Sequence, residues 1–346
     1  MSDIKEVVLI RRKISIMNKI TWSFITVTAL LLAMAVYSAV TGSLQAGPWE
    51  LVQGLFTGTN EKVEIIRDLR LPRIIIAVFS GAALAVAGVL FQAVMRNPLA
   101  DAGVIGISSG AGFSSLILVT LLPQWFFWSP LFAFLGGVVA CALVFLLSWK
   151  SGLSPIRIIL VGVAVNAMFS GLNEAFLTIC SYLQTGLSAE AASYTAYISL
   201  KTWDDVRIML LYGSLGLVAS LCLSTWCNLL SLQDKTVHNL GLNVTNARLI
   251  ISAVAVFLAA VTTAVAGVIA FVGLLIPHIA RRLVGSDHRA LIPFSALAGA
   301  LLILSADTLG RTLVPPNELP SSIIMSVIGG PVLILLLRKG GRVRGN

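Results

Sequence analysis

The feature that most limits the possible folds of this chain is a succession of apolar runs, many of them close to 20 residues long. A helix of that length rises about 30 Å, which matches the hydrocarbon core of a bilayer. Hydrophobic residues make up 57% of the 346 residues and charged residues 11%, against roughly 25% charged in soluble domains. A soluble protein with an unusually apolar core is the weaker alternative. We therefore expect an all-α polytopic membrane protein.

The apolar runs divide into ten candidate spans, which form one membrane domain over 20–340 with tails at 1–19 and 341–346. The first run is longer than the apolar core of a signal peptide, about 7–15 residues, so we expect a retained span. The eighth run is too short to cross alone and could serve only as a partial helix shielded by its neighbours. The ten spans are expected at 20–41, 72–95, 103–122, 129–148, 156–178, 207–227, 249–271, 274–284, 291–312 and 320–337.

The distribution of charge predicts which side of the membrane each loop faces. With the N-terminus in the cytoplasm, the inside segments hold 17 of the 24 Lys and Arg residues but only five of the 15 acidic residues. The inside then carries a net charge of +12 and the outside −3, which agrees with the positive-inside rule. Both termini are therefore expected in the cytoplasm, and the high net charge needs no nucleic-acid partner.

A broken apolar helix at 81–112 has a counterpart in the second half of the chain. The letters AVAGV occur at 85–89 and again at 264–268, and a proline follows ten residues after each glycine, at Pro98 and Pro277. The expected topology places the two copies in oppositely directed helices, as in the inverted repeats of transporters. Chance similarity between Ala/Val/Gly-rich helices is the alternative.

No residue constellation for catalysis was identified. The chain has no Gly-Lys dipeptide, so it lacks the phosphate-binding loop of nucleotide hydrolases. Its three histidines and four cysteines do not show metal-ligand spacing. We expect no catalytic residue, metal site or cofactor, and any ATP-driven step must belong to another subunit.

Polar side chains inside two of the spans are candidates for a transport path. Asn166, Ser170 and Asn173 follow one face of the fifth span, where they could line a water-filled path or join helices. Ser322 and Ser326 lie on the tenth span beside two glycines, where close helix packing is the alternative.

Charged residues near the expected outer face have competing interpretations. Asp307 and Arg311 are four residues apart on the ninth span and can pair on one helix face. Spacing alone favours pairing over a coupling-ion site. An outer basic cluster, Arg67, Arg70 and Arg73, could anchor the interface, pair with nearby acids, or dock an acidic partner. Spacing alone favours the first two.

The longest internal cytoplasmic loop, at 231–248, has an amphipathic pattern. Its apolar residues stand among polar ones, at Leu232, Val237, Leu240 and Leu242. A short helix that docks on a partner protein and a helix lying on the membrane surface are both open interpretations.

Several motifs in this order resemble the FecCD-type permeases, the membrane subunits of ABC importers for ferric siderophores, haem and vitamin B12. The resemblance runs from about residue 20 to 340. It departs from the family where Ala102 replaces a usual proline and where Ser321 and Ser322 follow the ELP motif. The matching motifs are RLPR (70–73), Gly81, Ala87-Gly88, Gln92, RNPLAD (96–101), GVIAFVGLLIPHIARRLVGSDHR (267–289), ADTLGR (306–311), ELP (318–320) and GGPVLILLLRK (329–339).

The resemblance implies a type II importer permease in the cell membrane, with ten helices and an inverted relation between spans 2–5 and 7–10. It implies a homo- or heterodimer with the path at the subunit interface, a cytoplasmic ATPase dimer and an external binding protein. A siderophore would be the first choice of cargo, haem the second and vitamin B12 the third. An ion-coupled secondary transporter, with Glu174 or Asp307 as coupling carboxylate, is the rival.

The resemblance also assigns roles to individual residues. Spans five and ten would line the path, and an iron complex that arrives already chelated needs no metal ligands there. The implied path residues are Asn166, Ser170, Asn173, Ser322 and Ser326. The implied docking residues for the binding protein are Arg70, Arg73 and Arg311. The implied residues for coupling to the ATPase are Asp234, Val237, Leu240, Gly241 and Leu242.

Overall fold

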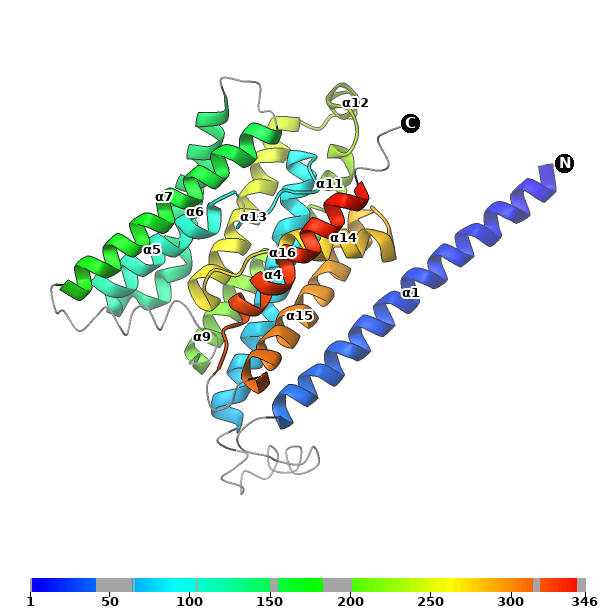
Figure 1. Ribbon diagram of the computed structural model, residues 1–346. Helices are drawn as coiled ribbons and strands as arrows, with labels where there is room; N and C mark the ends of the chain where they lie inside the picture. The colour runs from blue at the N-terminus through cyan, green and yellow to red at the C-terminus, as the bar shows by residue number, and fades with distance from the viewer. Residues whose placement is uncertain are drawn as a thin grey trace.

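The computed structural model describes residues 2–41, 64, 66–103, 105–149, 155–182, 201–313 and 318–340, and within these ranges the regular secondary structure is entirely helical (Figure 1). This confirms the expected all-α class. The α-helices are α1 (Ser2–Val40), α4 (Leu71–Met95), α5 (Ile107–Leu121), α6 (Ser129–Trp149), α7 (Pro155–Tyr182), α9 (Trp203–Ile208), α10 (Ser214–Cys222), α11 (Ser224–Leu230), α12 (Asp234–Asn239), α13 (Val244–Ala266), α14 (Val272–Val284), α15 (His288–Leu313) and α16 (Ser321–Gly340). Shorter turns of π- or 3₁₀-helix lie at η1 (Ile66–Arg70), η2 (Pro123–Trp128) and η4 (Met209–Gly213).

Seven helical segments of the described chain are long and apolar enough to cross a membrane, by length and composition. α5 and α14 contain 15 and 13 residues, so each rises only about 20 Å and cannot cross a hydrocarbon core of about 30 Å alone. The expectation of a short eighth helix is therefore confirmed, whereas the count of ten spans stays a prediction. The seven segments are Met17–Val40, Ile66–Met95, Pro123–Ser148, Leu160–Tyr182, Trp203–Cys222, Val244–Ala266 and His288–Leu313.

α4 is the central helix and packs against α13, α14 and α15. Every residue from Ser80 to Gln92 is buried. Apolarity alone does not explain this, because Pro123–Ser148 is equally apolar and much less buried. The many Ala and Gly residues of α4 let neighbouring helices pack closely around it.

Two glycine pairs let α4 approach its neighbours at main-chain distance. A Cβ added at Gly81 would lie 2.1 Å from the carbonyl oxygen of Gly299 on α15. A Cβ added at Gly88 would lie 2.2 Å from the carbonyl oxygen of Gly273 on α14. Small residues at helix crossings are how membrane helices gain close van der Waals contact in the absence of a hydrophobic driving force.

Arg73, in the first turn of α4, and Arg96, the residue after its last turn, mark the two ends of the bundle. The Arg73 end lies at the bottom of Figure 1, and the Arg96 end lies at the top beside α12. Asp234 on α12 forms ion pairs with both Arg96 and Arg248, and Arg248 lies in the second turn of α13. α13 therefore begins where α4 ends, and the two helices run in opposite directions.

Each of these two helices is followed by a break and then by a short helix. The break segment, defined here as the described residues 96–103, 105 and 106, separates α4 from α5, and residues 267–271 separate α13 from α14. Both short helices follow a residue with positive φ, Gly106 at 81° and Phe271 at 69°.

The letter-for-letter repeat does not mark equivalent positions in the two halves. Ala85–Val89 lies in the middle of α4, whereas in the second copy α13 ends at Ala266. Gly267 then adopts φ 79° and ψ −174°, which terminates the helix. Aligning the two halves on these letters would therefore be wrong, because identical apolar letters do not determine where a helix ends.

α1 lies at the edge of the molecule and slants away from the bundle toward the Arg96 end (Figure 1). Its helix already begins at Ser2, so the described part of the expected N-terminal tail is helical rather than a separate segment. α1 packs mainly against α15, where the rings of Phe24 and Phe294 meet edge to face with centroids 5.2 Å apart. The expected C-terminal tail at 341–346 lies outside the described residues.

Candidate functional site

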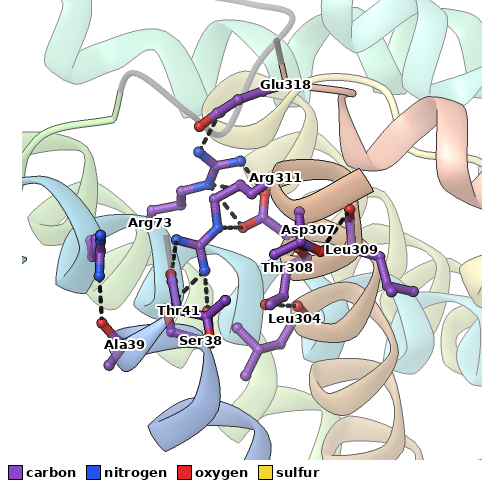
Figure 2. Close-up of polar contacts among 12 residues, drawn as sticks. Ser38, Ala39, Thr41, Arg73, Leu304, Asp307, Thr308, Leu309, Arg311 and Glu318 are labelled. Atoms are coloured by element: carbon purple, nitrogen blue, oxygen red, sulfur yellow. Dashed lines mark hydrogen bonds and ion pairs between the residues drawn. The ribbon is translucent and has the colours of Figure 1, made fainter. Parts of the chain in front are cut away.

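A buried charge network occupies the Arg73 end (Figure 2). Arg73 donates from Nε to both carboxylate oxygens of Asp307, at 3.1 and 2.8 Å, and from Nη2 to Oδ1 at 3.0 Å. Its Nη1 donates to Glu318 Oε2 at 2.6 Å. The side chains of Arg73 and Asp307 are only 8% and 2% exposed, whereas that of Glu318 is 43% exposed. Glu318 is therefore the part of this network that reaches the surface.

Two further arginines bind the last turn of α1. Arg311 donates from Nη2 to the carbonyl and the hydroxyl oxygen of Ser38, both at 2.8 Å. Arg70 donates from Nη1 to the carbonyl of Ala39 at 2.9 Å. The last carbonyls of a helix lack partners within it and carry partial negative charge. The two guanidinium groups satisfy these carbonyls and attach α1 to α4 and α15.

These contacts give the predicted docking arginines an internal role. Arg70 and Arg73 are buried, and the side chain of Arg311 is only 7% exposed. The expected pair of Asp307 with Arg311 is present at 3.9 Å, but Asp307 is closer to Arg73. Arg67, the third member of the predicted basic cluster, is exposed and pairs with Asp68 at 3.0 Å. Docking stays a prediction.

At the Arg96 end, the predicted coupling loop contains the short helix α12. Val237 is fully buried, whereas Leu232 and Leu240 are 42% and 61% exposed. The helix ends in a Schellman motif, because Gly241 N–H donates to the carbonyl of His238 and Leu242 N–H to that of Val237. Gly241 has φ 83°, which favours glycine.

This structure divides the five predicted coupling residues into two groups. Val237 and Leu242 face the protein and hold the loop, since Val237 is buried and Leu242 packs against the core. Asp234, Leu240 and Gly241 are exposed at the surface. Leu240 is therefore the apolar side chain of this group that a partner could contact, with Leu232 beside it in the loop.

Arg96 is a residue of this site that the analysis of the sequence did not single out for function. Its Nε donates to the carbonyl of Leu230 at 2.8 Å, and its Nη2 donates to the carbonyl of Leu232 and to Asp234 Oδ1. Arg96 thus connects the end of α4 to the start of the coupling loop. A basic residue directly after a long apolar helix was the available signal, but its partners lie more than 130 positions away.

Further along the break segment, Asp101 is buried against the first turn of α14. The Oδ1 atom of buried Asp101 lies 2.1 Å from the position that a Cβ on Gly273 would occupy. Burial raises the pKa of the Asp101 carboxyl to about 6, although the main-chain N–H groups of Gly103 and Ala102 act in the opposite direction. Asp101 therefore joins the break segment to the beginning of the second short helix.

Gln92, one of the motif residues, forms a second link to α14. Its Nε2 donates to the carbonyl of Gly273 at 2.9 Å, and its Oε1 accepts from Arg281 Nη1. The side chain thus bridges α4 to both ends of α14.

The predicted path residues of α7 lie on a helix that packs against α5 and α6. Asn166 and Asn173 are half-buried and Ser170 is exposed. Large apolar side chains beside them, including Met168 and Leu172, are 46% and 41% exposed. α7 therefore has a face of mixed polar and apolar side chains that the rest of this chain does not cover.

The predicted path residues of α16 lie on a helix that packs against α14 and α15. Ser322 is half-buried, and Ser326 is exposed and donates from its hydroxyl to the carbonyl of Ser322 at 2.9 Å. Gly329 lies against Phe271, since a Cβ there would be 2.5 Å from the Phe271 ring. Close packing is thus present at Gly329, one turn beyond the two serines.

The chain is similar in sequence to known transport proteins. Residues 30–339 match the model of the FecCD transport family. The "Probable heme-iron transport system permease protein IsdF" of Staphylococcus aureus, in strains Newman and COL, is 41% identical over 329 residues. That alignment covers 95% of this chain and 99% of the relative.

Two solved structures share the fold. One, described as an inward-facing conformation of a metal-chelate type ABC transporter, has a TM-score of 0.74 and 30% identity, and the match covers 91% of this chain and 98% of the other. PsaBC from Streptococcus pneumoniae, in complex with Fab, has a TM-score of 0.54 and 14% identity over 83% of this chain and 94% of the other, which shows likeness of fold alone.

Proposed function

Because the chain belongs to the FecCD transport family, we propose that it is the membrane-spanning subunit of an ABC importer that carries an iron complex into the cytoplasm. The observation that carries the proposal is the 41% identity to a heme-iron transport permease over nearly the whole of both chains. ATP would be hydrolysed by separate subunits. The Arg96 end, with the predicted coupling loop, would face the cytoplasm, and the Arg73 end would face outward.

Haem is the cargo that we propose first, with a ferric siderophore second. The motifs alone favoured a siderophore, whereas the similar relatives are described as heme-iron permeases. Among the described residues, no group of three His, Cys, Asp or Glu side chains is placed to hold a metal. An iron complex that stays chelated during transport would need no such group.

The architecture that we propose for the importer has ten membrane segments in two inverted halves. The order of helix lengths supports this, since a long helix, a break, a short helix and two long helices occur twice. The first set is α4 to α7 and the second is α13 to α16. The opposite directions of α4 and α13 are also what an inverted repeat requires.

A second permease subunit would cover the exposed faces of α7 and α16, and the path would lie between the subunits. Asn166, Ser170 and Asn173 would line it from α7, and Ser322 and Ser326 from α16. The mixed polar and apolar face of α7 supports this arrangement, because a purely lipid-facing helix would not place these side chains together.

A cytoplasmic ATPase dimer would bind the coupling loop. The proposal rests on the exposed side chains of Leu232 and Leu240, which belong to the same loop as the buried Val237. Docking of an external binding protein by Arg70, Arg73 and Arg311 would require a carboxylate of that protein to replace an internal partner. Glu318 is the candidate for replacement, because it is bound to Arg73 and reaches the surface.

The rival function, ion-coupled secondary transport, is less well supported. A coupling carboxylate must gain and lose its ion in each cycle. Asp307 is held by three hydrogen bonds from Arg73, which favours a permanently charged structural role. Glu174, exposed on α7, is the carboxylate that this rival would still require.

Reconstitution tests the proposal directly. The permease, its ATPase and its binding protein are placed in proteoliposomes with ATP on the ATPase side, and uptake of haem and of a ferric siderophore is measured. ATP-dependent uptake that a protonophore leaves unchanged supports the importer. Uptake that a protonophore abolishes, without need for ATP, would establish the rival. When both compounds are offered together, the one that inhibits uptake of the other at the lower concentration is the preferred cargo.

A further inference from the structure

Arg96 holds a backbone conformation that is unfavourable for its residue type. It has φ 48° and ψ 36°, in the left-handed region. Among the described residues, the only other non-glycine residue with positive φ is Phe271, in the second break. A side chain with a Cβ costs roughly 1–2 kcal/mol in this region, and glycine would avoid the cost. The presence of arginine here points to a use for its guanidinium group.

The guanidinium group of Arg96 binds three acceptors at the start of the coupling loop. These are the carbonyl of Leu230, at 2.8 Å, the carbonyl of Leu232, and Asp234 Oδ1, at 2.6 Å. A planar guanidinium group fixes the direction of several hydrogen bonds at once, which a lysine ammonium cannot do. The loop and the residue that ends α4 are thus held in one orientation.

The break segment that starts at Arg96 touches two further helices. Asp101 lies against Gly273 in the first turn of α14. Gly106 lies against the main chain of α7, since a Cβ there would be 2.8 Å from the Asn166 nitrogen. Contacts that leave no room for a methyl group transmit displacement, because packed atoms cannot be compressed.

We propose that Arg96 is a positioning residue that passes a displacement of the coupling loop into the break segment, and through it to α7 and α14. The inference rests on the proposed function and adds the route by which ATPase movement reaches the helix that bears Asn166 and Asn173. Arg96 itself touches neither ATP nor cargo.

The chain offers a matched control for this role. Arg248, on α13, also pairs with Asp234, with Nη2 at 3.2 and 3.3 Å from the two carboxylate oxygens. Replacing Arg248 removes one cation from Asp234 and leaves the link between the loop and α4 in place. Replacing Arg96 removes that link.

The test compares Arg96→Asn, Arg96→Gly and Arg248→Asn in the reconstituted importer. Asparagine and glycine both tolerate the left-handed region, so the end of α4 is retained while the guanidinium group is lost. ATP hydrolysis and cargo uptake are measured in the same proteoliposomes. For both Arg96 variants we expect basal ATP hydrolysis to stay within about twofold of wild type, while cargo moved per ATP falls about tenfold. Arg248→Asn should keep the wild-type ratio.

Each other outcome overturns the inference or its premise. The route through Arg96 would be refuted if the Arg96 variants moved as much cargo per ATP as wild type. It would also be refuted if Arg248→Asn lost as much cargo per ATP as the Arg96 variants. Failure of both Arg96 variants to assemble with the ATPase, seen by size-exclusion chromatography, would make Arg96 a structural residue and also refute it. A wild-type complex that shows no ATP-dependent uptake would instead refute the proposed function.

Discussion

The guanidinium group of Arg73 and the carboxylate of Asp307, which are 234 positions apart, form a buried ion pair with Nε 2.8 Å from Oδ2. Removing the Asp307 carboxylate leaves the buried Arg73 guanidinium group with the 43% exposed Glu318 as its remaining counter-charge. We expect Asp307→Asn to lower the free energy of unfolding by about 3–5 kcal/mol. The matched control is Asp68→Asn in the exposed pair with Arg67, where solvent screens the charges and a much smaller loss is expected. Thermal unfolding in detergent compares the two, and equal shifts would contradict a special role for the buried pair.

The crossing of α4 and α14 predicts an effect of a single methyl group. In Gly88→Ala the new Cβ would meet main-chain atoms of Gly273, which cannot move aside as a side chain can. The helices must separate, at a cost of about 1–3 kcal/mol. The control is Gly213→Ala, whose Cβ would lie 3.6 Å from Phe79, an ordinary contact distance. A loss of melting temperature in the control as large as that in Gly88→Ala would refute this explanation.

Asp101 predicts a pH-dependent difference in stability. Its pKa is raised by burial to about 6, so the folded protein binds the proton more tightly than the unfolded chain. The contribution of this group to stability is therefore greatest below pH 4, falls as the pH rises to 6, and is level above that. The melting temperature of wild type relative to Asp101→Asn should fall over that range. If the melting temperature of wild type relative to Asp101→Asn instead rises with pH, the first turn of α14 stabilises the carboxylate more than burial destabilises it.

The α1 attachment predicts local opening. Arg311→Gln removes the guanidinium group that binds Ser38, so amide hydrogens in the last turns of α1 should exchange faster. The control is Arg207→Gln, which breaks an exposed pair with Asp204 on α9. Hydrogen exchange measured by mass spectrometry on peptides that cover residues 30–41 gives the result. Exchange that is unchanged in Arg311→Gln would show that Arg70 and the apolar contacts hold the end of α1 without Arg311.

The predicted path gives a test on α7. We expect the double variant Asn166→Leu and Asn173→Leu to reduce uptake about tenfold without loss of assembly, because a polar path loses two hydrogen-bonding groups. Glu174→Gln is the control, since it changes an adjacent exposed side chain of the same helix. Normal transport in the double variant would reassign the stripe to helix packing. Loss of uptake in Glu174→Gln would revive the ion-coupled rival.

Features that depend on local composition were predictable from the sequence. The apolar runs predicted most helices at the observed places, and the short eighth run corresponds to the 13 residues of α14. The seventh run was expected to continue to 271, which is wrong, because α13 ends at Ala266 and Gly267 leaves the helical conformation. The short helix of the coupling loop also followed from its pattern of leucine and valine. Periodicity is a property of neighbouring residues, so these predictions did not require knowledge of which helices touch.

Features that depend on partners far along the chain were not predictable. Asp307 was expected to pair with Arg311, four residues away, whereas its closer partner is Arg73. Arg96 was placed at a helix break, but its contacts with Leu230, Leu232 and Asp234 form only when the loop folds back on α4. The AVAGV repeat would give a wrong alignment because the termination of α13 at Gly267 is set by backbone conformation, which the letters do not show.

The polar attachment of α1 also has a consequence for biosynthesis. The carbonyls at the end of the first helix are bound by Arg70, which follows soon in the chain, and by Arg311, which is made 273 residues after Ser38. Asp307, which fixes Arg73 beside them, is made equally late. While the nascent chain is being inserted, α1 must therefore remain in the bilayer without its final anchor. Truncation before residue 307 should leave this first helix free to be recognised by the quality-control proteases of the membrane.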